Sequence, residues 1–98
     1  MSIRRYIRGT TIRLKNIIRD SDGVLIDPSG SVKVELFDGE NSSALASTDM
    51  IRVSTGIYYY DWQSRADSVL GFYKQRCTAV DSLKTSIEED AQAFELYA

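Results

Sequence analysis

Hydrophobic and polar residues alternate with a period of two along most of the chain, and this pattern predicts β-strands rather than helices. In the segment SVKVELFD, Val32, Val34 and Leu36 share one face, and charged residues take most of the other. Glycine- and serine-containing turn segments separate the alternating stretches. The predicted strands cover residues 11–20, 31–38, 44–53, 56–63, 70–81 and 84–98. We therefore predict an all-β, antiparallel sandwich of about seven strands with immunoglobulin-like topology, with a small barrel as the alternative.

One strand breaks the alternation, because Ile17 and Ile18 are both hydrophobic and adjacent. A β-bulge near Asn16 would restore the alternation of faces, because a bulge inserts one extra residue into a strand. We expect such a bulge in this strand.

The segment TGIYYYDWQ contains three of the six tyrosines and the single tryptophan. On a strand, Tyr58, Tyr60 and Trp62 share one face, and each ring can bury ~150–250 Å². We predict that this face lies in the core. The same alternation predicts that Tyr73, Cys77 and Ala79 face inward, and it places Phe94 and Leu96 on one face near the end of the chain.

Four hydrophobic residues fall on outward positions in this register: Phe37, Ile57, Tyr59 and Phe72. If they lie together, they form one exposed hydrophobic patch, which usually marks an interface. The alternative is that they are scattered singly, as exposed aromatic residues commonly are. A register error of one residue would exchange the two faces.

Charge is distributed unevenly along the chain, although the net charge is only −2. The first 19 residues carry six basic side chains and no acidic one, whereas residues 20–40 and 81–98 are acidic. The basic segment includes Arg4, Arg5 and Arg8, and the acidic run near the C-terminus is Glu88, Glu89 and Asp90. Residues 1–9 are predicted to be a basic N-terminal arm or edge strand that pairs with acidic residues of the same chain or of a neighbouring copy. Nucleic-acid binding is the less favoured interpretation of the same arginines.

The chain has no histidine and one cysteine, so the commonest general base and metal ligand are missing and no intrachain disulfide can form. The segment DSDG with Asp27 has some calcium-loop character, but a turn explains it more simply. No Gly-x-Ser-x-Gly nucleophile motif or phosphate-binding glycine loop occurs. We expect a protein without catalytic activity, cofactor or metal ion.

At 98 residues, the chain has the length of one domain, residues 1–98. No segment approaches the ~20 hydrophobic residues of a membrane span, and the arginine-rich N-terminus lacks the hydrophobic stretch of a secretion signal. We expect a protein that stays in the cell that makes it, away from membranes.

The order of GTTIRL, DGVLIDP, VKVELFD, STGIYYYDW, GFY and SIEEDAQAFEL resembles the compact immunoglobulin-like β-sandwich domains found in bacteriophage and archaeal-virus proteins and in prokaryotic surface proteins. The resemblance covers nearly the whole chain, and its motifs concern fold more than function. The single cysteine excludes the antibody type with two paired cysteines. The resemblance implies a structural component of a virus particle, such as a head–tail connector, a tail protein or a capsid decoration, which binds copies of itself or other particle proteins. A carbohydrate-binding or adhesive module that uses exposed tyrosines is the alternative.

Overall fold

The computed structural model describes residues 4–82 and 84–98, with the side chains of residues 90–92 left aside. In this part of the chain there are eight strands and no helix, so the all-β prediction is confirmed. The strands are β1 (Arg5–Ile7), β2 (Thr11–Ile17), β3 (Val32–Phe37), β4 (Ser43–Asp49), β5 (Ile51–Ser54), β6 (Ile57–Gln63), β7 (Gly71–Asp81) and β8 (Lys84–Tyr97).

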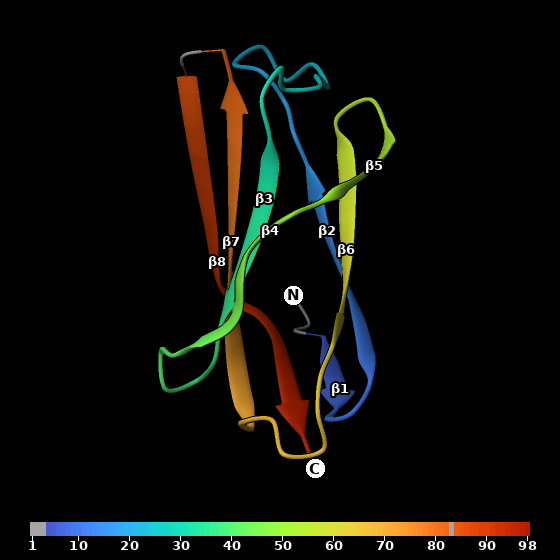
Figure 1. The fold of residues 1–98 in the computed structure, drawn as a ribbon, viewed down its shortest axis with the longest axis vertical. Helices are drawn as coiled ribbons and strands as arrows, with labels where there is room; N and C mark the ends of the chain where they lie inside the picture. Colours follow the sequence, from blue (N-terminus) through green and yellow to red (C-terminus); the bar gives the residue numbers. More distant parts are fainter. Residues whose placement is uncertain (1–3, 83) are drawn as a thin grey trace.

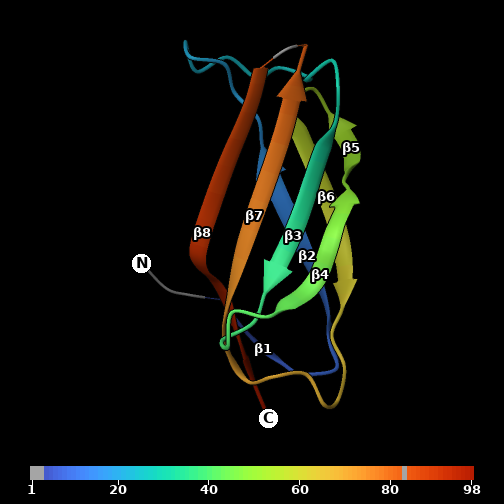
Figure 2. The same ribbon diagram turned by 60° about the vertical axis from the view of Figure 1, so that its left-hand side comes forward.

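The strands form two sheets in a sandwich-like arrangement (Figures 1 and 2). The larger sheet has the order β1-β8-β7-β3-β4, and the smaller sheet has the order β2-β6-β5. Neighbouring strands are antiparallel except β1 and β8, which run parallel with Arg5 beside Glu95 and Ile7 beside Tyr97. The first strand therefore lies at an edge of the larger sheet, next to the last strand. The molecule is elongated along the strands, with extents of 41 × 26 × 20 Å.

The predicted strand over residues 44–53 is in fact two strands in different sheets. β4 pairs with β3 in the larger sheet, whereas β5 pairs with β6 in the smaller sheet. The chain crosses between the sheets at Met50, whose side chain is buried and whose N–H donates to the Val32 carbonyl at 2.9 Å. Alternation along the sequence does not distinguish the two sheets, because both have an inward and an outward face. The six strands predicted by residue range become eight, because residues 43–54 form two strands and β1 is an additional one.

The bulge expected near Asn16 is not present in the pairing of β2 with β6. The register is continuous from Thr11 opposite Gln63 to Ile17 opposite Ile57. Asn16 faces inward, where its side-chain oxygen accepts a hydrogen bond from Gln75 of the other sheet at 3.0 Å. The strand simply ends at Ile17, and Ile18 packs against the core from outside the strand. The two adjacent isoleucines thus reflect the chain leaving the sheet.

The core lies between the two sheets and contains the inward-facing residues of both. Its buried hydrophobic members are Ile12, Leu14, Val32, Val34, Leu36, Met50, Tyr58, Trp62, Tyr73, Cys77, Ala79, Phe94 and Leu96. Tyr58 and Trp62 are buried, and Tyr60 is partly buried against them, so the predicted inward face of β6 is confirmed.

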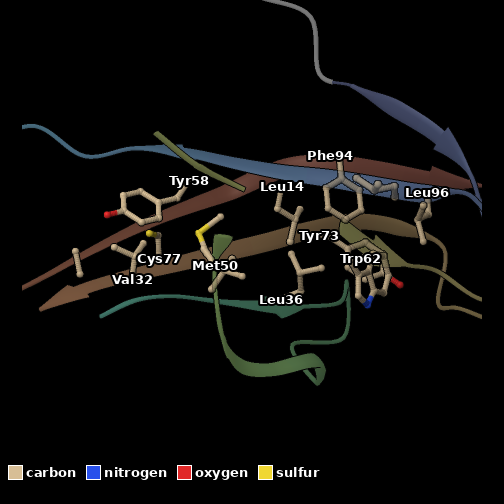
Figure 3. Packing of buried hydrophobic residues seen from close by; sticks show 13 residues of the cluster. Leu14, Val32, Leu36, Met50, Tyr58, Trp62, Tyr73, Cys77, Phe94 and Leu96 are labelled. Carbon is tan, nitrogen blue, oxygen red and sulfur yellow. The ribbon is translucent and has the colours of Figure 1, made fainter. Parts of the chain in front are cut away.

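The rings of Trp62, Tyr73 and Phe94 gather at one end of this core (Figure 3). Phe94 stacks on Tyr73, with ring centroids 5.0 Å apart and an angle of 11° between the planes. Trp62 lies 5.5 Å from Tyr73 and 6.0 Å from Phe94. Tyr6 of β1 meets the edge of Phe94 at 6.0 Å, so the first strand closes this end of the core. Aromatic pairs at such distances stabilise a core beyond the area they bury.

Candidate functional site

Charged residues cover the outer face of the larger sheet. Arg76 of β7 lies 3.1 Å from Glu89 of β8 and 3.9 Å from Glu35 of β3, and Lys74 lies 3.4 Å from Glu89. The cationic groups of Lys74 and Arg76 lie 4.8 and 5.0 Å from the centre of the Phe37 ring. Phe37 is therefore half-buried under its own neighbours, and little of its ring is left to bind a partner.

The basic N-terminal residues belong to the edge of the same sheet. Arg5 lies 2.8 Å from the Glu95 carboxylate and 4.7 Å from the centre of the Tyr97 ring. Arg8 donates to the Ser68 carbonyl at 3.4 Å, whereas Arg4 is exposed. At least one arginine of the predicted arm thus pairs within its own chain, as the intramolecular interpretation expects.

The four hydrophobic residues on outward positions do not lie together in one patch. Phe37 and Phe72 lie on the outer face of the larger sheet, whereas Ile57 and Tyr59 lie on the outer face of the smaller sheet. The two pairs are on opposite sides of the sandwich, because the outer faces of two packed sheets point away from each other. Phe72 is 40% exposed.

The outer face of the smaller sheet holds a hydrophobic cluster of its own. Ile17 lies opposite Ile57, and Ile51 lies opposite Tyr59 across the adjoining strand pair. Ile17 and Ile51 are 46% and 52% exposed. We call Ile17, Ile51, Ile57 and Tyr59 the small-sheet patch. The sequence pattern does not reveal Ile17 and Ile51 as members of this patch, because it predicts a bulge beside Ile17 and one strand over residues 44–53.

Tyr59 is half-buried in this patch because a charged neighbour covers it. The Arg13 guanidinium lies 4.2 Å from the centre of the Tyr59 ring. Two hydrogen bonds, at 2.8 and 3.0 Å, hold the same guanidinium to the Asp61 carboxylate. These bonds to Arg13 lower the pKa of Asp61. One face of the Tyr59 ring is therefore already occupied by a side chain of the protein.

The acidic run of β8 divides between the two faces of the strand. Glu89 points outward into the ion pairs with Lys74 and Arg76. Glu88 lies opposite Cys77 in the register, on the inward face, where its exposed side chain lines a groove. The side chain of Asp90 lies outside the described residues, and its backbone pairs with Gln75.

The groove has a volume of about 370 Å³ and lies where the edges of the two sheets open, between β8 and the end of β2. Cys77, Ala79, Ser86 and Glu88 of the larger sheet line one side, and residues 17–21 line the other. Burial, with a smaller contribution from Glu88, raises the pKa of the Cys77 thiol to about 11. The thiol is therefore protonated at neutral pH and is a poor nucleophile.

The carboxylate of Asp27 ties the connection between β2 and β3 to the smaller sheet. Its two oxygens accept hydrogen bonds from the Gly56 N–H at 2.9 Å, the Tyr58 hydroxyl at 3.1 Å and the Arg52 Nε at 2.9 Å. The hydrogen bond from Gly56 is the largest cause of the lowered pKa of Asp27, and it outweighs desolvation, which acts to raise this pKa.

The DSDG segment forms a turn in which the Asp20 carboxylate accepts hydrogen bonds from two backbone N–H groups. Among the described residues, no cluster of His, Cys, Asp or Glu is arranged to hold a metal ion.

Asp27 should make the fold less stable at acidic pH than at neutral pH. A carboxylate whose pKa is lower in the folded chain stabilises the fold fully above its ordinary pKa of 3.8, and the contribution is lost as the pH falls through the folded value. We expect wild-type protein to unfold at lower urea concentration at pH 3 than at pH 7. In Asp27→Asn the midpoint should be lower at pH 7 and should change less between the two pH values. An equal change in both proteins would contradict this role.

No family model, curated protein or solved structure matches this chain. The described residues include no helix with the length and hydrophobicity needed to cross a membrane.

Proposed function

We propose that this chain is a non-catalytic, immunoglobulin-like β-sandwich that works through protein–protein contact as a structural component of a virus particle. The observation that carries the proposal is the small-sheet patch. Ile17 and Ile51 are about half exposed and lie in register with Ile57 and Tyr59 on one face. Exposed hydrophobic clusters of this kind mark protein interfaces.

The immunoglobulin-like assignment has support in the topology. Two packed sheets share one core, the first and last strands are neighbours at an edge, and the chain changes sheets between β4 and β5. The assignment to a particle, as a head–tail connector, tail or decoration protein, rests on the sequence resemblance.

Carbohydrate binding has less support. A tyrosine platform for sugars needs an open ring face, and the Arg13 guanidinium lies 4.2 Å from the centre of the Tyr59 ring.

Nucleic-acid binding also has less support, because arginines near the N-terminus have partners within the chain. Arg5 pairs with Glu95, and Arg13 pairs with Asp61. These pairs leave less free positive charge for phosphate groups than the sequence alone suggests.

The test is incorporation into particles. A tagged copy of the chain, expressed in the cells that produce the virus particles, should co-purify with these particles in a constant ratio to the major particle protein. The double variant Ile17→Asp with Ile51→Asp should be incorporated roughly tenfold less, because charges would be buried in a hydrophobic contact. Val24→Asp is the matched control, since Val24 is 58% exposed in the loop before β3. Absence of the wild-type chain from particles would overturn the proposal, as would equal incorporation of both variants.

A further inference from the structure

One edge of the larger sheet is only partly covered. β7 pairs with β8 from Lys84 to Leu96, but β1 covers the other side of β8 only from Glu95 to Tyr97. Within residues 4–82 and 84–98, no strand pairs with this side of β8 from Lys84 to Glu89. Figure 1 shows this part of β8 at the outer side of the larger sheet. The open edge therefore presents a row of backbone donors and acceptors, which is a template for another strand.

The register limits this open edge to one straight segment. The pairing of β7 with β8 shifts between Tyr73, which lies opposite Phe94, and Gln75, which lies opposite Asp90. A step of two residues along β7 thus corresponds to a step of four residues along β8. This irregularity separates the end of β8 that β1 covers from the end that is open. The open segment Lys84–Glu89 reads KTSIEE and contains no proline, so each residue retains a backbone N–H.

We propose that this open edge binds a second copy of the chain, with the two β8 strands antiparallel about a two-fold axis at Ser86. The proposal rests on the proposed role as a protein-interaction module, but it uses a different surface from the small-sheet patch. In such a pair, residues directly opposite each other lie on the same face of the joined sheet. Because the two strands are identical, an even-numbered residue can therefore lie opposite only an even-numbered one, and an odd-numbered residue only an odd-numbered one.

Charge complementarity selects this register. With the axis at Ser86, Lys84 of each copy lies opposite the partner's Glu88, and this contact occurs twice. Both side chains line the groove on the inward face and are exposed in the single chain. An axis at Glu88 instead places two identical carboxylates directly opposite each other, which destabilises a strand pair.

Hydrophobic burial on the outward face supports the same arrangement. Ile87 is 59% exposed, the largest exposure among the hydrophobic residues of the larger sheet. In the proposed pair, Ile87 lies opposite Thr85 of the partner, and β-branched residues pack well across strands. The two five-stranded sheets would then form one continuous sheet through the dimer.

The experiment is a charge-exchange cycle read by sedimentation velocity over a concentration series. Wild type should dimerise, and added salt should weaken the dimer because its charge contacts are exposed. Lys84→Glu and Glu88→Lys should each reduce the association constant roughly tenfold, since each replaces two attractive contacts by two repulsive ones. The double variant Lys84→Glu with Glu88→Lys should regain the dimer.

Arg65→Glu is the control, because it makes the same charge change in an exposed loop and should dimerise like wild type. Circular dichroism at low concentration checks that each variant is folded. A monomeric wild type at all concentrations would overturn the proposal, and so would a dimer that the double variant does not restore. A monomeric wild type that is still incorporated into particles would overturn this inference alone, whereas absence of the wild-type chain from particles would overturn the proposed function.

Discussion

Replacing Phe94 by alanine should destabilise the fold more than any other single truncation in β8. Phe94 is only 2% exposed, and its ring contacts the rings of Tyr6, Trp62 and Tyr73. Truncation of a buried phenylalanine typically costs ~3–5 kcal/mol, because the surrounding side chains fill the cavity only in part. Domains of this size have a total stability of ~5–15 kcal/mol, so the variant should be close to unfolding.

The measurement is the free energy of unfolding from urea titration, with the melting temperature as a second readout. For a domain of ~100 residues, each kcal/mol lowers the melting temperature by ~4–8 °C, so a decrease of at least ~12 °C is expected. Phe72→Ala is the matched control. Phe72 lies on the outer face of the same sheet, is 40% exposed, and should cost about 1 kcal/mol or less. Equal losses in the two variants would contradict the assignment of the inward face.

Replacing Gly56 by alanine should have a comparable effect for a different reason. Gly56 lies in the turn between β5 and β6 with φ of 74°, a conformation that costs other residues ~1–2 kcal/mol. An added Cβ would also lie 2.7 Å from the Ile18 carbonyl oxygen and 3.0 Å from the Leu25 Cβ. The chain cannot relieve this contact freely, because Ile18 donates its N–H to the Gly56 carbonyl at 2.7 Å. We expect a total cost of about 3 kcal/mol or more.

Gly23→Ala separates the two contributions to this cost. Gly23 has φ of 83°, but a Cβ there would meet nothing within 4 Å. Its replacement should therefore cost only the conformational part, ~1–2 kcal/mol. The difference between the two variants in urea denaturation measures the steric part. If Gly56→Ala proved no worse than Gly23→Ala, the close packing of the β5–β6 turn against Ile18 and Leu25 would be contradicted.

Alternation along the sequence was sufficient to predict which residues of a strand face inward. Val32, Val34 and Leu36 in β3 and Tyr73 and Cys77 in β7 are buried as predicted, and Phe94 and Leu96, which were placed on one face of β8, are buried together. Successive side chains of a strand point to opposite faces, so this property depends on the strand itself and on which face is the more hydrophobic. The all-β class followed from the same pattern, and the absence of an intrachain disulfide followed from the single cysteine.

The candidate site could be predicted only in part, because it depends on which strands are neighbours. Ile57 and Tyr59 were correctly placed on an outer face, but their partners are Ile17 and Ile51, and not Phe37 and Phe72. Ile17 is 40 residues from Ile57 in the sequence, and Ile51 is 8 residues from Tyr59. No local pattern reveals such pairing, because alternation determines which face a side chain takes and not which strand lies beside it.

The sequence by itself therefore determined the fold class, the inward residues of most strands and the uneven distribution of charge. Only the tertiary structure decided the division of β4 and β5 between two sheets, the parallel pairing of β1 with β8, and the opposite placement of Glu88 and Glu89 relative to the groove and the ion pairs. It also left the edge of β8 from Lys84 to Glu89 without a strand among the described residues. The physical reason is that side-chain alternation is a local property, whereas sheet order and free edges result from contacts between distant parts of the chain.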